Sequence, residues 1–126
     1  MLDATALRSL SAARLEDARV LYGNGRYNGA AYICGYAVEL ALKARICDTL
    51  DVAAYPEHLP GFKIHKLNTL LLLSGREKYV IRNHKTIWNL ATAKWDPDLR
   101  YQATNTISAQ EAQTLIRETA NLLPLL

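Results

Sequence analysis

The stretch GRYNGAAYICGYAVELALKARI, residues 25–46, decides the fold of this chain. Between Gly29 and Leu42 its residues are apolar on almost every side when they are placed on a helix. A helix without a sustained polar face must be contacted from several directions. The stretch therefore predicts a central, buried helix, which we expect to run from Arg26 to Leu50.

Two charged residues interrupt this apolar segment. Glu39 and Lys43 have the i,i+4 spacing, with the acid first, that favours a side-chain pair, and they share a helical stripe with Tyr36. Charges among apolar neighbours are tolerated only when they are paired or partly solvated. The pair therefore either bridges helices or subunits, or lines a polar binding cleft. Arg14, on the preceding helix, either reaches Glu39 or extends into solvent.

The rest of the chain also shows helical patterns. Turn signals separate them: GNG at 23–25, a Pro-containing loop before IHKL, and WDPDLRYQATNT at 95–106. The expected helices run from Asp3 or Thr5 to Tyr22, Arg26 to Leu50, His65 to Ser74, Glu77 to Ala93, and from a Ser108–Glu111 capping box to Leu123. The fold class predicted is all-α, an up-and-down antiparallel bundle of four main helices plus a short extra helix, in one domain over residues 1–126.

Composition limits the classes of function. The chain has 126 residues and a formal charge of +3, which is too mild for a dedicated nucleic-acid binder. Apolar runs such as LLLL at 70–73 are too short to cross a bilayer, and no charged-then-apolar leader opens the chain. Cys34 and Cys47 fall about 20 Å apart on one predicted helix, which excludes a disulfide between them. These features predict a cytoplasmic protein that does not associate with membranes.

Three segments resemble a known family. GRYNGAAYICGYAVELALKA at 25–44, IHKL at 64–67 and WDPDLRY at 95–101 are similar to the HEPN domain, named for higher eukaryote and prokaryote nucleotide-binding proteins. The resemblance extends from about residue 4 to about residue 122. It implies a helical bundle, a homodimer, and a minimal nucleotidyltransferase partner in a toxin–antitoxin-like pair. Other members of the family are metal-independent RNases.

The RNase motif of that family has an Arg followed, after four to six residues, by a His. His58 and His65 have no Arg at that distance upstream, whereas His84 follows Arg82 with one residue between them and Arg76 with seven. On one continuous helix Arg82 and His84 would point to opposite sides, and Arg76 would lie about 12 Å from His84 along the axis. The motif is therefore absent, and we do not expect an enzyme. No cofactor is expected, and His and Cys lack metal-ligand spacing.

Three functions remain. The first is non-catalytic binding to a second copy and to a nucleotidyltransferase partner, and the exposed sides of helices 26–50 and 77–93 are the candidates for the homodimer interface. The second is a degenerate RNase that uses His84 with Arg82 or Arg76. The third is a module that binds a nucleotide or RNA. Its proposed ligand-binding residues are Tyr36, Glu39, Lys43 and Arg100.

Overall fold

In the computed structural model, residues 2–95 and 106–126 are described, and their regular secondary structure is entirely helical. The all-α prediction is thereby confirmed. The α-helices are α1 (Ala4–Gly23), α2 (Tyr27–Leu50), α3 (Leu67–Ser74), α4 (Glu77–Asn83), α5 (Lys85–Thr92) and α6 (Ala109–Leu122), with 3₁₀ turns η1 (Pro60–Phe62) and η3 (Leu123–Leu125).

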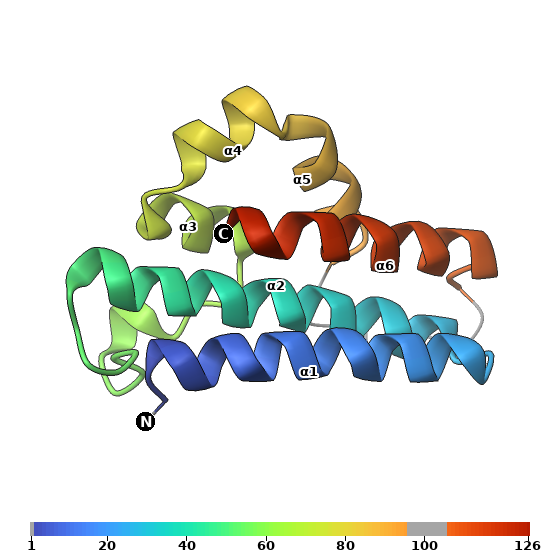
Figure 1. Cartoon of the computed structure of the whole chain (residues 1–126), viewed down its shortest axis with the longest axis horizontal. Helices are drawn as coiled ribbons and strands as arrows, with labels where there is room; N and C mark the ends of the chain where they lie inside the picture. The colour runs from blue at the N-terminus through green and yellow to red at the C-terminus, as the bar shows by residue number, and fades with distance from the viewer. Residues whose placement is uncertain (1, 96–105) are drawn as a thin grey trace.

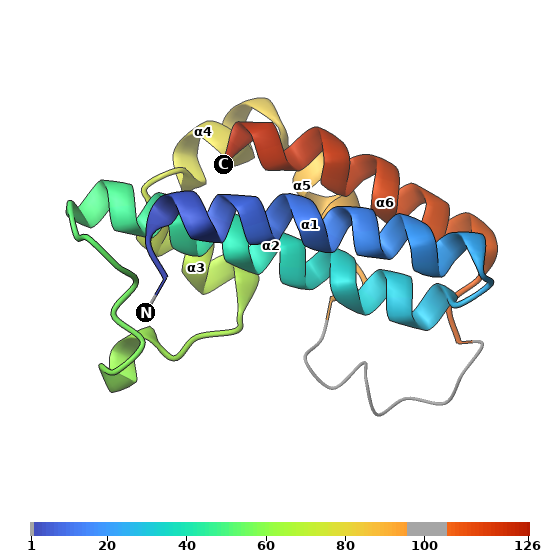
Figure 2. The ribbon, with the colours of Figure 1, turned by 60° about the horizontal axis from the view of Figure 1, so that its bottom comes forward.

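Three long helices form the base of the fold, and three short ones arch over it (Figure 1). α1 and α2 run antiparallel as a hairpin, whereas α6 lies along them in the same direction as α2, as both ribbon views show (Figure 2). The arch of α3, α4 and α5 carries the chain from the end of α2 towards the start of α6. The packing is therefore only partly antiparallel. The prediction of four main helices in an up-and-down order is corrected, because the described chain has three long helices and two of them run in the same direction.

Local sequence signals account for most helix ends. The Asp3 carboxylate accepts a hydrogen bond from the Ala6 amide at 2.8 Å and caps α1. Gly25 adopts a φ of 73° in the turn after α1, a conformation that glycine reaches without strain. Ser108 and Glu111 form the predicted capping box of α6, in which each side chain bonds the other residue's amide.

α2 is the centre of the core, as predicted. It packs against α1, α3, α5 and α6, and Leu42 and Ile46 have no exposed surface. Cys34 and Cys47 are buried free thiols on this helix, which confirms that they form no disulfide with each other. Burial raises the pKa of the Cys34 thiol to about 11, so it stays protonated and packs as a small apolar group.

The helix predicted over Glu77 to Ala93 is wrong in one respect, because it breaks at His84. His84 has φ −140° and ψ 30°, outside the helical region, and separates α4 from α5. The Asn83 side chain donates to the Tyr79 carbonyl at 3.0 Å, which satisfies a carbonyl near the end of α4. Asn competes in this way with helical hydrogen bonds. The break lets the arch bend over α6 instead of running straight past it.

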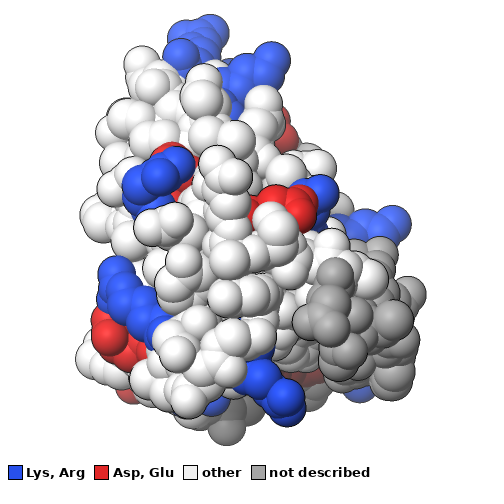
Figure 3. Space-filling model, turned by 90° about the vertical axis from the view of Figure 1, so that its right-hand side faces the viewer, with Lys and Arg blue, Asp and Glu red and all other residues white. Residues whose placement is uncertain are grey.

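Charged side chains are interspersed on the end of the molecule where α1 ends and α6 begins (Figure 3). Positive and negative groups are separated there by broad uncharged areas, so the described residues of this face form no continuous basic patch. No helix in the described part of the chain has both the length and the apolar character that a membrane span requires.

We predict that Leu40→Asp lowers the free energy of unfolding by roughly 3–5 kcal/mol, because it places an unpaired charge in the core. Leu40 is 5% exposed on α2, whereas Leu50 at the end of the same helix is 46% exposed. Leu50→Asp is the matched control and should change stability by about 0.5 kcal/mol or less. Urea denaturation followed by circular dichroism measures both. Equal losses for the two variants would contradict the central position of α2.

Candidate functional site

The charge pair of α2 is fully formed and buried. Lys43 Nζ lies 3.2 Å from Glu39 Oε2, and the two residues are 6% and 2% exposed. Taking two charges out of water is costly, and their mutual attraction offsets that cost only when the remaining polar atoms also find partners. The other contacts of the pair therefore determine what it does.

The second oxygen of Glu39 binds a residue from the loop before α3. His65 Nδ1 lies 3.0 Å from Glu39 Oε1, and the His65 side chain is 61% exposed. Lys43 lies over the ring of Tyr55, with Nζ 5.0 Å from the ring centroid, a cation–π arrangement. A buried carboxylate is thus linked to solvent through one imidazole, and the pair also anchors the loop between α2 and α3.

Tyr55 is the buried anchor of that loop. Its hydroxyl donates to the Phe62 carbonyl at 2.7 Å, and its amide donates to the Leu2 carbonyl at 3.1 Å. Burial raises the pKa of Tyr55 to about 12, and the negative charge of Glu39 adds to this shift. The hydroxyl therefore remains a neutral donor and keeps the loop against Lys43.

A pocket of about 270 Å³ opens beside His65, between the start of α3 and the end of α5. Trp95 forms one side of it, and its indole Nε1 donates to the His65 carbonyl at 3.2 Å. The ring can lie against α2 only because residue 35 is glycine. A Cβ atom at Gly35 would be 1.9 Å from Trp95 Cε3. Gly35 is therefore needed for the position of Trp95, and hence for the shape of the pocket.

The residues that we expected to bind a ligand differ in how far they are buried. Glu39 and Lys43 are buried and contact His65 and Tyr55, whereas Tyr36 is half-buried. Burial raises the pKa of Tyr36, and the charge of Glu39 raises it further. Arg100 lies outside the described residues. Any ligand contact by the buried pair would have to be made through His65.

The sequence left two alternatives for the Arg14 side chain, contact with Glu39 or extension into solvent. Its Nε lies 3.1 Å from Asp17 Oδ2, one turn along α1, and its side chain is 35% exposed. The described partners of Glu39 are Lys43 and His65. Arg14 is thus paired along its own helix, and its side chain is partly buried, with the Nε atom shielded from solvent.

The residues of the RNase alternative have different surroundings. The Arg76 guanidinium donates twice to the Leu125 carbonyl, at 3.1 and 2.7 Å, and lies over the Tyr79 ring. His84 Nε2 lies 3.2 Å from the Tyr79 hydroxyl. Arg82 is exposed and makes no hydrogen bond or ion pair with the described residues. Arg76 therefore holds the arch against the chain after α6, and Arg82 alone is free to meet a ligand.

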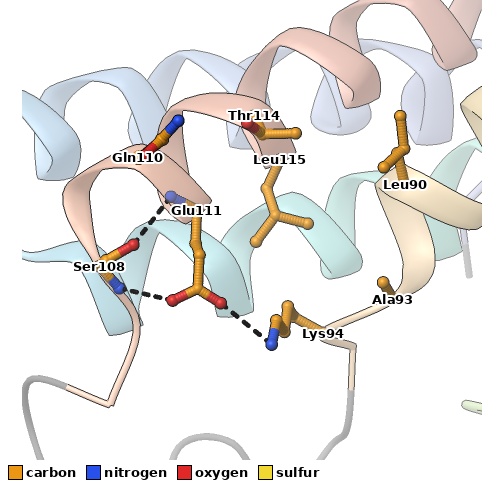
Figure 4. A pocket seen from close by; sticks show the side chains of 8 residues that line it. All are labelled: Leu90, Ala93, Lys94, Ser108, Gln110, Glu111, Thr114 and Leu115. Atoms are coloured by element: carbon orange, nitrogen blue, oxygen red, sulfur yellow. Dashed lines mark hydrogen bonds and ion pairs between the residues drawn. The ribbon is translucent and has the colours of Figure 1, made fainter.

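A second pocket, of about 300 Å³, lies between the end of α5 and the start of α6 (Figure 4). Lys94 Nζ and Glu111 Oε2 form an ion pair across it at 3.0 Å. The bond from the Ser108 amide, followed by the contact with Lys94, lowers the pKa of Glu111. Ser108, Glu111 and Lys94 bond to one another, and Leu90 and Leu115 provide apolar lining.

Sequence reasoning overlooked His65 and the pairing of its ring with Glu39. No Arg precedes His65 at the distance that the RNase motif requires, so that motif does not identify it. The one sequence feature that points to His65 is IHKL at 64–67, which places a His at the end of the loop that follows the helix of Glu39 and Lys43. Its partner is 26 positions away, so spacing along the chain could not identify it.

We predict that Lys43→Met destabilises the fold by roughly 3–5 kcal/mol, since it leaves the Glu39 carboxylate buried without a cation. The double variant Glu39→Met/Lys43→Met removes both charges and should recover most of that loss. The exposed pair of α1 provides the control, because Asp17→Asn should cost about 1 kcal/mol or less. Urea denaturation at neutral pH compares the three. The buried pair is not a structural requirement if Lys43→Met costs no more than Asp17→Asn.

Comparison with known proteins gives one match. The HEPN domain family matches residues 5–126 of this chain. No curated protein and no solved structure shows a significant similarity. The match covers almost the whole chain and agrees with the helical architecture and with the segments that suggested the resemblance. The chain belongs to the HEPN domain family.

Proposed function

We propose that this HEPN domain acts by binding, to a second copy of itself and to a minimal nucleotidyltransferase partner in a toxin–antitoxin-like pair. The observation that carries the proposal is a set of partly exposed apolar side chains on the arch. These are Leu72 (60% exposed), Leu73 (38%), Tyr79 (40%) and Leu90 (41%). Single exposed apolar residues are ordinary, but several on one layer are typical of a protein interface.

The position of α2 narrows the proposed interface. We expected helices 26–50 and 77–93 to contribute exposed sides, yet α2 is covered by α1, α3, α5 and α6 and offers little surface. The arch offers more, because α3 to α5 cover the long helices with one side and face outwards with the other (Figure 1). We therefore place the interface on α3–α5.

We predict that the wild-type protein is a dimer at micromolar concentration and that Leu72→Glu shifts it towards monomer. A charge at the centre of an apolar interface must be desolvated without a partner, which weakens association. Val20→Glu is the matched control, because Val20 is 64% exposed on α1, away from the arch, and Leu72 is 60% exposed. Multi-angle light scattering reports the mass of each. A wild-type monomer would contradict the dimer, and equal dissociation by both variants would contradict the interface.

The partner is tested separately. The protein is co-expressed with a minimal nucleotidyltransferase whose gene neighbours its own, and the pair is passed over a sizing column. We expect co-elution at fixed stoichiometry, together with relief of any growth defect that either protein causes alone. Separate elution without a growth effect would overturn the nucleotidyltransferase part of the proposal and leave the dimer standing.

One observation favours the RNase alternative. Arg82 is exposed and unpartnered among the described residues, and the break at His84 removes the continuous helix on which the two side chains would point apart. General acid–base catalysis still requires the imidazole within hydrogen-bond reach of the proton that moves, with the cation at the same phosphate. Within one chain, the spacing of Arg82 and His84 does not match the family motif.

We predict no efficient metal-independent cleavage of RNA by the purified protein. The assay compares wild type with His84→Ala and Arg82→Ala in the presence of a chelator. Equal inactivity of all three is the expected result. Cleavage by wild type that both substitutions abolish would establish the RNase function instead.

A further inference from the structure

We propose that His65 and Trp95 form a binding site for a small aromatic molecule that carries an O–H or N–H donor. The site is the pocket of about 270 Å³ between the start of α3 and the end of α5. It is independent of the interface proposed on the arch, because it requires neither a second copy nor a protein partner.

The first support is the orientation of the His65 ring. An ionised carboxylate can only accept hydrogen bonds, so the contact of 3.0 Å between Glu39 Oε1 and His65 Nδ1 requires a hydrogen on Nδ1. Lys43 Nζ, 3.2 Å from the other oxygen, compensates the charge of that carboxylate. Neutral His65 therefore carries its lone pair on Nε2, which makes no hydrogen bond with the described residues. One tautomer is selected, and its free acceptor belongs to a side chain that is 61% exposed and lines the pocket.

The second support is the composition of the pocket. Trp95 supplies an aromatic surface held by its bond to the His65 carbonyl, and Asn68, Thr69 and Thr92 supply short polar side chains. The Asn68 Oδ1 atom already accepts from Trp88 Nε1 at 3.2 Å, and the Thr92 hydroxyl donates to the Trp88 carbonyl at 2.7 Å. These oxygens and the Thr69 hydroxyl retain acceptor lone pairs, and His65 Nε2 is the nitrogen acceptor among the side chains that line the pocket.

The third support is size. Pockets for drug-sized ligands occupy roughly 300–1,000 Å³, and this one falls just below that range. It therefore fits a single ring with a short substituent. Such a ring can stack on Trp95 while its O–H or N–H donates to Nε2.

The test uses phenol and anisole as matched probes, which share the ring but differ in the O–H donor. Proton–nitrogen correlation spectra of labelled protein at about pH 8.5, where an ordinary imidazole is neutral, first report the tautomer of each histidine. We expect His65 as the Nδ1–H form, with exposed His58 as the internal control for an imidazole without a fixed tautomer. Phenol should then shift the His65 and Trp95 signals saturably, and anisole should bind roughly fivefold more weakly, the difference of one hydrogen bond.

His65→Phe keeps a ring at this position and removes the acceptor, so phenol and anisole should bind this variant equally. If the variant does not fold, the tautomer of His65 in wild type and the titrations of wild type with phenol and with anisole still test the proposal. The proposal is overturned if His65 is the Nε2–H form or if wild type binds both probes equally. Signals that respond only around Leu90 and Leu115, in the pocket of Figure 4, would also overturn it.

Discussion

The buried pair of Glu39 and Lys43 is the constraint on which the site depends. Two opposite charges on one turn of α2 lie in the core, where each needs further partners to offset the loss of water. Those partners come from the loop after α2, as His65 for the carboxylate and Tyr55 for the ammonium. Satisfying the pair therefore positions the loop that leads into α3 and the arch.

The arch depends on a second set of polar contacts. Arg76 donates to the Leu125 carbonyl, and Arg45 on α2 donates to Leu126 O at 3.1 and 2.6 Å. The two guanidiniums hold the chain after α6 between the central helix and the arch. An arginine that could have met a phosphate is thus used for structure. The same contacts keep the arch over α6, with the outer side chains of α3–α5 uncovered.

Membership of the HEPN family gives the fold, and the geometry of the chain bears on the choice between the proposed functions. The family includes binding proteins and RNases, so membership alone does not separate them. The surroundings of Arg76 and the apolar surface of the arch support the proposed association, whereas the break at His84 supports the RNase alternative. The proposed ligand site at His65 is distinct from both functions, and it rests on the contact of the His65 ring with the buried Glu39 carboxylate.

Signals within one or two helical turns could be read from the sequence alone. The all-round apolar pattern of α2, the Asp3 cap, the Ser108–Glu111 capping box and the i,i+4 pairing of Glu39 with Lys43 are local, and each is present in the structure. The break at His84 was missed because a helical pattern of apolar residues continues through it, while the backbone departs from the helix at one residue. Only the tertiary structure decided that His65 meets Glu39 and that Arg76 meets Leu125, 26 and 49 positions apart. Contacts at such separations depend on how helices are placed in space, which the periodicity of a single segment does not encode.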